Sequence, residues 1–297
     1  MGERVLILDG DGTTNFTGRA SGTQSIDSVA QPVMTFILKY RMHIIVLSLL
    51  LVIHSLEWSL GHVSLDTIVV AFSVACVIAF AYLFNKATDT EEDMKSRKGE
   101  EISPQSVRNT YVAASVLAIL PLCWLWLYPT ALGLFVVVAL AGFLYSSRRA
   151  FGFRVKDMFL LKNLFSAGFF WAMPVAISPA TWRGSMSSLD AVHFAFVYLI
   201  ALMIEIFWDM RDVDGDRQAG IRTIPNTCGF LFTKILVTAV GVIATVVAAT
   251  NAYPLVVYPG IALLVLFVIG ATRVRPAYYY HMMIFVWIIA VARELVF

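Results

Sequence analysis

Charged residues are scarce in this chain, and their scarcity excludes an ordinary soluble protein. Lys, Arg, Asp and Glu make up 14% of the 297 residues, whereas soluble domains carry about 25%. Hydrophobic residues make up 59%, and the mean hydropathy is +0.77. The composition therefore indicates an integral membrane protein, with the lipid bilayer as a partner and no nucleic acid.

Cysteine is also scarce. The three cysteines, Cys76, Cys123 and Cys228, lie in or near apolar runs at wide spacing. Zinc sites and disulfide frameworks have paired cysteines at short, regular spacing. We therefore expect neither, and we interpret the three thiols as packing residues.

Long polar segments between the apolar runs are missing too, which favours one helical domain. A spanning helix needs about 20 mostly apolar residues. Nine runs of this kind follow the polar start of the chain, at residues 42–60, 65–84, 111–128, 130–146, 161–179, 189–208, 231–250, 253–271 and 277–296. We expect an all-α membrane protein in which residues 1–32 form a polar, flexible cytoplasmic segment and residues 33–297 form a nine-helix transmembrane domain.

The basic residues are distributed unevenly between the two sides of the membrane. Of the 22 Lys and Arg residues, all but Arg183 and Arg293 lie in the amino-terminal segment, in the loops after the second, fourth, sixth and eighth runs, or in the first turn of the run that follows such a loop. Short cytoplasmic loops carry an excess of Lys and Arg. We therefore expect the amino terminus and these loops to be cytoplasmic.

Two acidic clusters follow the second and sixth runs, on the same expected side. The first is NKATDTEED, residues 85–93, and the second is DMRDVDGD, residues 209–216. Helical periodicity places Asn85, Asp89 and Asp93 on one face of the first segment.

In the second cluster, the same periodicity aligns Asp209, Asp212 and Asp216, and it directs Asp214 away from them. Glu205 extends this row one turn into the sixth run. Helical geometry beyond Gly215 is assumed here, because a glycine often ends a helix. One alternative is that both clusters are solvated acidic loops.

Carboxylate and amide oxygens without His or Cys suit Mg²⁺ or Ca²⁺ rather than zinc. Mg²⁺ is commonly held by a few carboxylates together with the phosphates of a substrate. Two facing rows of carboxylates therefore predict a diphosphate bound between them through Mg²⁺, with basic side chains of the loops nearby.

Both clusters resemble the motifs of the UbiA family of intramembrane prenyltransferases. NKATDTEED fits the pattern N-x-x-x-D-x-x-x-D, and DVDGDRQAGIRTIP fits D-x-x-x-D with its trailing G-D-R-x-x-G-x-R-T-x-P. The segment YSSRR, residues 145–149, is similar to the family's Y-x-x-x-K, with Arg in place of Lys. The resemblance implies a helical bundle around a central cavity, Mg²⁺ between the motifs and an isoprenyl diphosphate as substrate.

The resemblance also implies roles for individual residues. The implied metal ligands are Asn85, Asp89, Asp93, Asp209, Asp212 and Asp216. The expected diphosphate contacts are Lys98, Tyr145, Arg149, Lys156 and Arg222. Asp89, Asp93, Asp212, Asp216 and Glu205 form the expected catalytic set, with Glu205 either a base or a polar residue paired within the bundle.

The sequence departs from the family pattern in the first motif. Lys86 stands where many members have Asp, and MKSRKGEEISPQ has no Arg-Pro segment. How this loop covers the substrate is therefore open.

Three functions are compatible with these residues. A prenyltransferase would ionise geranyl, farnesyl or geranylgeranyl diphosphate and pass the prenyl group to an aromatic or lipid-like acceptor. A terpene cyclase of the same superfamily would close the prenyl chain on itself without an acceptor. A cation transporter is a more remote alternative, since transporters place acidic residues near the midplane.

Overall fold

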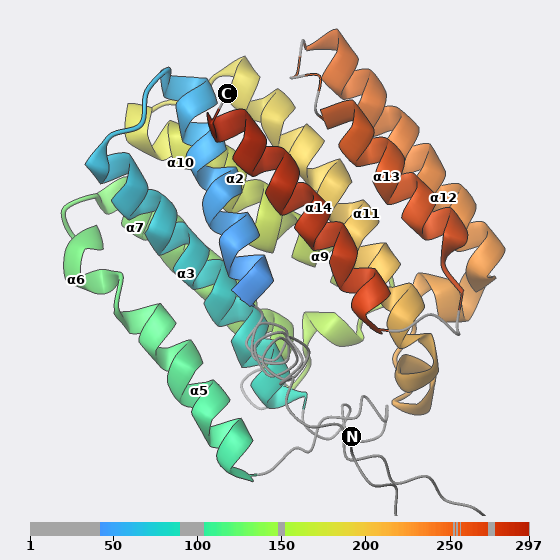
Figure 1. The fold of residues 1–297 in the computed structure, drawn as a ribbon. Helices are drawn as coiled ribbons and strands as arrows, with labels where there is room; N and C mark the ends of the chain where they lie inside the picture. The colour runs from blue at the N-terminus through green and yellow to red at the C-terminus, as the bar shows by residue number, and fades with distance from the viewer. Residues whose placement is uncertain are drawn as a thin grey trace, which may run out of the picture. The chain divides into compact units, whose positions relative to one another are not determined.

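The computed structural model describes residues 42–89, 104–147, 152–251, 253, 255, 257–272 and 277–296. The chain divides into two compact units, Met1–Lys39 and Tyr40–Phe297. All described residues belong to the second unit, and the boundary expected after residue 32 lies outside them. Every regular element in the described ranges is a helix (Figure 1).

The helices match the nine expected runs. They are α2 (Met42–Leu60), α3 (Leu65–Thr88), α5 (Pro104–Ile119), α6 (Leu122–Leu125), α7 (Pro129–Ser146), η1 (Val155–Asp157), α9 (Leu161–Ser166), η2 (Ala167–Ala172), α10 (Met173–Arg183), α11 (Ser188–Gln218), α12 (Ile224–Thr250), α13 (Val257–Gly270) and α14 (Ala277–Val296). Among the described residues, seven helical segments are long and apolar enough to cross a membrane, and Val257–Gly270 and Met282–Ala292 are shorter apolar helices. The expected all-α architecture with nine spanning segments is thus confirmed.

Helix α11 is longer than the run that predicts it. The apolar run ends at residue 208, but α11 continues to Gln218 and carries the whole second acidic cluster. Gly215 does not end the helix. The turn comes instead at Gly220, whose φ of 73° is in the left-handed region that favours glycine.

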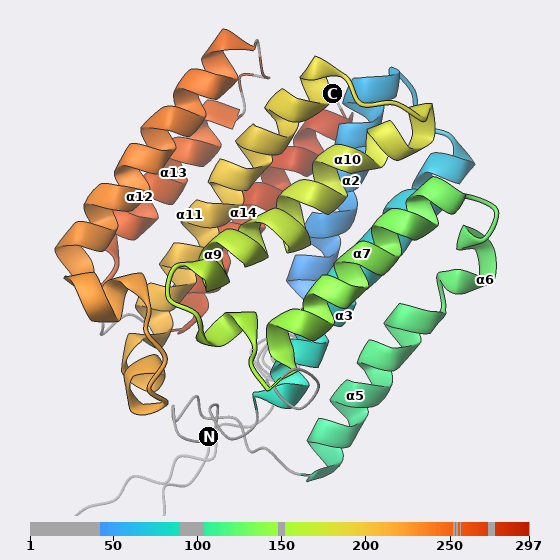
Figure 2. The same cartoon turned by 180° about the vertical axis from the view of Figure 1, so that it is seen from behind.

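Helices α3 and α11 organise the bundle around the acidic segments. Helix α3 packs against α2, α5 and α7, while α11 packs against α10, η2 and α12. In both views α5 and α6 lie at one edge of this unit and α12 and α13 at the opposite edge (Figures 1 and 2). The carboxyl ends of α3 and α11 point to the same end of the bundle (Figure 1).

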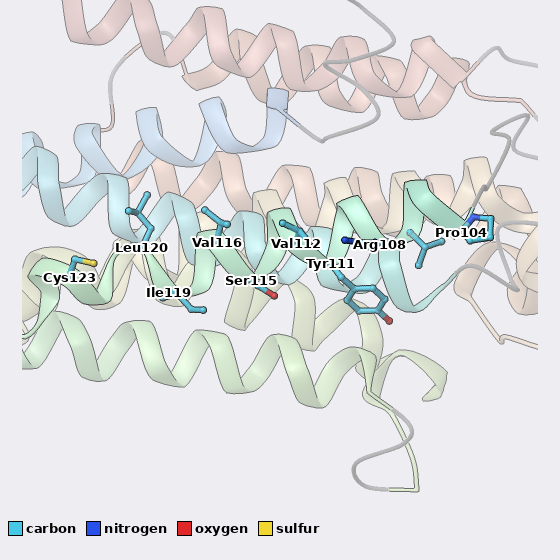
Figure 3. A pocket seen from close by; sticks show the side chains of 10 residues that line it. Pro104, Arg108, Tyr111, Val112, Ser115, Val116, Ile119, Leu120 and Cys123 are labelled. Atoms are coloured by element: carbon cyan, nitrogen blue, oxygen red, sulfur yellow. The ribbon is translucent and has the colours of Figure 1, made fainter.

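An apolar groove of about 740 Å³ runs along α5 and α6 (Figure 3). Arg108 is the charged residue in its lining, and the exposed side chains along it include Val112, Val116 and Ile119. Large exposed apolar patches mark contact with a membrane or a partner. We interpret this groove as lipid-facing surface, because the acidic clusters do not line it.

Helices α3 and α7 approach each other closely at Gly142. A Cβ atom at this position would lie 2.9 Å from the Cβ of Ala81 on α3, a distance at which something must shift. Tyr145 follows one turn later on α7. The small residue at position 142 therefore sets how near Tyr145 comes to α3.

Replacing Gly142 with Val is expected to destabilise the protein by about 1 to 3 kcal/mol, because overpacking forces the two helices apart. Thermal unfolding in detergent measures this effect. Gly133→Val is the matched control, since Gly133 lies on the same helix and a Cβ there would meet nothing within 4 Å. Equal melting temperatures for the two variants would contradict the close-packing argument.

Candidate active site

Carboxylates from the ends of α3 and α11 line one cavity of about 110 Å³. Its polar lining consists of Tyr82, Asn85, Lys86, Asp89, Tyr145, Lys156, Lys162, Ser166, Glu205, Asp209, Arg211, Asp212 and Asp216. Ala81, Phe170 and Trp208 complete the wall. Residues far apart in sequence therefore meet in a single polar chamber.

The α3 side of the cavity is built around Asp89. This residue follows the last helical residue, and its backbone N–H donates to the Asn85 carbonyl at 3.0 Å. Its carboxylate is buried and forms ion pairs with Lys156 and, at 3.3 Å, with Arg154. The Asn85 side-chain oxygen accepts a hydrogen bond from the Ser146 hydroxyl at 3.2 Å. Asp89 is thus paired with cations from the segment after α7.

The α11 side presents Asp209, Asp212 and Asp216 to the cavity. Their spacings of three and four residues put them on one face of a continuous helix. Asp214 is exposed and is absent from the cavity lining, in agreement with the helical periodicity of the sequence.

Lys162 joins two of these carboxylates. Its Nζ lies 2.8 Å from Oδ1 of Asp209 and 3.7 Å from Oδ2 of Asp216. Asn163 Nδ2 donates to Oδ2 of Asp209 at 2.9 Å. Lys162 and Asp209 are both more than nine-tenths buried, so each charge depends on the other.

Sequence reasoning missed this role of Lys162. The lysine was counted only among the basic residues of the loop after the fourth run. The signal was available, because Lys162 and Asn163 stand inside the apolar run that begins at residue 161. Charged residues within a span usually face a cavity and pair with one another.

An irregular backbone brings Lys162 into the cavity and Asn163 to Asp209. Leu160, just before α9, has a φ of 64°, which is rare for a residue with a side chain. The helix then widens into the π-turn η2, in which the Met173 N–H donates to the Gly168 carbonyl five residues earlier. Pro174 has no N–H and clashes with a carbonyl one turn back, which accounts for the wider turn. Single π-turns are frequent at functional sites.

Glu205 lies deeper in α11 and is held by neutral hydroxyl groups. Its Oε1 accepts hydrogen bonds from the Tyr82 hydroxyl at 2.8 Å and the Ser166 hydroxyl at 2.7 Å. Trp171 Nε1 in turn donates to the Tyr82 oxygen at 2.7 Å. Sequence reasoning named Glu205 but missed its two partners, although Tyr82 lies on the helical face of Asn85 and Asp89.

The expected diphosphate contacts differ in whether they line the cavity. Tyr145 and Lys156 line the cavity, and the Tyr145 ring packs against Phe165 and Phe170. Arg222 is exposed, lies over the ring of Phe159 at 5.0 Å and is absent from the cavity lining. Lys98, Arg149 and the expected ligand Asp93 lie outside the described residues.

The carboxylates line one cavity, but they do not surround a common point. Among the described residues, no three His, Cys, Asp or Glu side chains are grouped closely enough to hold a metal ion. Asp89 is turned to Lys156 and Arg154, and both oxygens of Asp212 are held at 2.8 Å by Arg211.

The composition of the lining nevertheless suits a hard divalent cation. Five acidic and four basic side chains line the cavity, so its own cations are already matched by carboxylates. The buried Oδ2 of Asp216 accepts no hydrogen bond from the described residues. Oxygen ligands of this kind bind Mg²⁺ or Ca²⁺. An anion that enters the cavity would need such a metal cation beside it.

A second, apolar cavity of about 40 Å³ lies behind Trp171. Ile204, the neighbour of Glu205, and Trp171 both line it, together with Leu47, Leu51, Phe196, Val197, Ile200, Ala201 and Trp287. A hydrogen bond from Trp171 to Tyr82 therefore connects the wall of the apolar cavity with the wall of the polar chamber.

Comparison with known proteins identifies similar chains. A model described as the UbiA prenyltransferase family matches residues 29–291. Comparison with curated protein sequences finds no match.

Among solved structures, a UbiA homologue from Archaeoglobus fulgidus bound to DMAPP and Mg²⁺ is 15% identical, with a TM-score of 0.61 over 87% of this chain and 98% of that chain. The same homologue bound to GPP and Mg²⁺ gives 15% identity and a TM-score of 0.60, over 88% and 98% of the two chains. A structure described as concerning digeranylgeranylglyceryl phosphate synthase gives 15% identity and a TM-score of 0.54, over 89% and 99%. At this identity, these structures establish the fold.

Replacing Lys162 with Met is expected to destabilise the protein by about 3 to 5 kcal/mol, because it leaves the buried Asp209 without its cation. Thermal unfolding in detergent measures the loss. The double variant Lys162→Met with Asp209→Asn should recover part of it, since the uncompensated charge is then removed.

Lys234→Met is the matched control for this cycle. The Lys234 ammonium donates to the backbone carbonyl of Ile269, so its removal exposes no buried carboxylate. A double variant no more stable than Lys162→Met alone would refute the coupling between Lys162 and Asp209.

Proposed function

Because the chain belongs to the UbiA prenyltransferase family, we propose that it is a Mg²⁺-dependent intramembrane prenyltransferase acting on an isoprenyl diphosphate. The prenyl group would pass to an aromatic or lipid-like acceptor. One observation carries this proposal: Asp89 of the first acidic segment and three aspartates of the second line the same cavity as Lys156 and Lys162. The bundle is that of a multi-pass membrane protein.

The residues proposed to hold Mg²⁺ are Asn85, Asp89, Asp93, Asp209, Asp212 and Asp216. The donor set supports this assignment, since it consists of carboxylate and amide oxygens and includes a buried Asp216 oxygen that accepts no hydrogen bond from the described residues. The homologue from Archaeoglobus fulgidus was solved with Mg²⁺ and either DMAPP or GPP. Bound Mg²⁺ would neutralise charge that develops on a departing diphosphate.

Lys156 and Lys162 are the side chains of this chain best placed to face a diphosphate. Both line the cavity, and both are already held there by aspartates. Tyr145 adds a hydroxyl to the same wall, and Lys98, Arg149 and Arg222 remain proposed contacts. Oriented cations of this kind stabilise the leaving group without reorganising at the moment of reaction.

The apolar side of the chamber suits the other half of the substrate. Cleavage of the allylic C–O bond leaves a carbocation that water would capture, so the site must be dry. Phe170 and Trp208 line the chamber, and Trp171, which donates to Tyr82 of the chamber wall, lines the apolar cavity. Aromatic ring faces attract a cation within about 6 Å.

We place the mouth of this chamber at the cytoplasmic surface. The excess of Lys and Arg in the amino-terminal segment and in the loops that carry the acidic clusters supports this orientation.

Asp89→Ala and Asp212→Ala are each expected to lower turnover of a prenyl diphosphate by at least about 100-fold, because each removes a metal-binding carboxylate. Diphosphate release by the purified protein measures turnover. Chelation with EDTA should abolish wild-type release, and added Mg²⁺ should restore it.

Asp214→Ala is the matched control, because Asp214 lies on the same helix but is exposed and outside the cavity lining. Wild-type turnover in either metal-site variant, or release that survives chelation, would sink the metal-site assignment.

Product analysis separates transfer from cyclisation. With geranyl, farnesyl or geranylgeranyl diphosphate and no acceptor, a transferase should give slow release and only the prenyl alcohol, because water is then the only nucleophile. Mass spectrometry identifies the products. A cyclic hydrocarbon formed without acceptor would replace the transferase proposal with the terpene cyclase.

A further inference from the structure

The outer face of α5 and α6 is the least covered part of the bundle. In the span Pro104–Leu125, 17% of the most apolar window is buried, which is the lowest share among the seven spans of the described residues. The groove of about 740 Å³ follows this face from Pro104 to Cys123 (Figure 3). A ligand in the groove would therefore lie on the lipid-facing side of the bundle, apart from the polar chamber.

The groove has the size and the lining of a binding site. Such sites commonly have volumes of about 300 to 1,000 Å³ and apolar walls with a few polar groups that orient the ligand. Here the polar groups of the lining include Arg108, Tyr111 and Ser115. Arg108 and Tyr111 both lie in the first two turns of α5. This arrangement favours a ligand with a polar head at that end and an apolar body along the rest of the groove.

The charge at this end of the groove favours an anionic head. Arg108 is exposed, and within the described part of the chain no hydrogen bond or ion pair engages it. The lining of the groove contains no carboxylate among the described residues, and the first turn of α5 has no acidic residue. A guanidinium group binds phosphate oxygens with two parallel hydrogen bonds. A phosphate head group would therefore supply the charge that Arg108 lacks.

The length of the groove matches one leaflet of a bilayer. At 1.5 Å per residue, the helical rise from Arg108 to Ile119 is about 16 Å, and half of a hydrocarbon core is about 15 Å. Val112 and Val116 lie along this path and are exposed, as is Ile119. Arg108 is at the end of α5 that we place on the cytoplasmic side, where anionic lipids attract basic residues.

We propose that the groove along α5 and α6 binds an anionic phospholipid of the cytoplasmic leaflet, with its phosphate against Arg108 and one acyl chain along Val112, Val116 and Ile119. The site is separate from the polar chamber and does not rest on the proposed function. A second copy of this chain fits the face less well, because it would bring its own Arg108 to the contact and no carboxylate from the described lining.

Native mass spectrometry of the full chain in detergent tests this site, with dioleoylphosphatidylglycerol and dioleoylphosphatidylcholine as probes. Wild-type protein should bind one phosphatidylglycerol at least about fivefold more tightly than phosphatidylcholine, because one Arg at an anionic surface contributes attraction of this size. Arg108→Gln should remove the preference. Arg217→Gln is the matched control and should keep it, because Arg217 is exposed and lies outside the lining of the groove.

Val116→Trp tests the apolar part of the site. Val116 is 52% exposed, so the larger ring extends into the groove and does not enter the core. Binding of both lipids should weaken at least about tenfold, which corresponds to the loss of about two buried methylene groups. Val137→Trp is the matched control, because Val137 on α7 is 43% exposed and lies outside the lining. This control should bind both lipids as the wild type does.

Three results would overturn the proposal. The first is equal binding of the two lipids by the wild type, or a preference for phosphatidylglycerol that survives in Arg108→Gln. The second is displacement of bound phosphatidylglycerol by millimolar inorganic phosphate, which would assign Arg108 to a free anion. The third is a dimer that is lost in Val116→Trp and kept in Val137→Trp, which would assign this face to a second copy of the chain.

Discussion

A buried carboxylate needs a cation, and this requirement shapes the whole site. Asp209 and Lys162 are each more than nine-tenths buried and lie 2.8 Å apart. Either charge alone would cost several kcal/mol in such surroundings. The segment between α7 and α10 therefore has to enter the bundle, and its left-handed residue and π-turn serve that course. Lys156 meets the same demand for Asp89 from the loop before α9.

The lengths of the apolar runs made much of the fold predictable from the sequence. Nine apolar runs predict nine spanning segments, because a single segment satisfies its own backbone within lipid only as a helix. The same signal does not mark where a helix ends. Helix α11 continues ten residues beyond its apolar run, since a helix needs backbone hydrogen bonds and not apolar side chains once it leaves the bilayer. Periodicity along that extension correctly separated Asp212 and Asp216 from Asp214.

The partners of the acidic residues were less predictable. Lys162 and Arg222 are both basic residues of the expected cytoplasmic side, yet Lys162 is buried between aspartates and Arg222 is exposed over Phe159. The excess of Lys and Arg in the loops on one side cannot distinguish these two residues, because it depends on the number of charges and not on their burial. The bonds of Glu205 to Tyr82 and Ser166 join residues separated by 123 and 39 positions. Such pairs follow from tertiary packing, which local patterns do not contain.

The distribution of charge within the chamber also supports the proposal that one site binds a diphosphate and shields a carbocation. The aspartates and lysines gather at the carboxyl ends of α3 and α11, where they already form ion pairs. Glu205 lies one turn deeper and is bonded to hydroxyl groups, and the Trp171 indole that donates to Tyr82 also lines an apolar cavity. Polarity therefore falls in steps from ion pairs to neutral hydrogen bonds to hydrocarbon. The proposed substrate, with a charged head and an apolar tail, would fit this order in one orientation, with its head at the ion pairs.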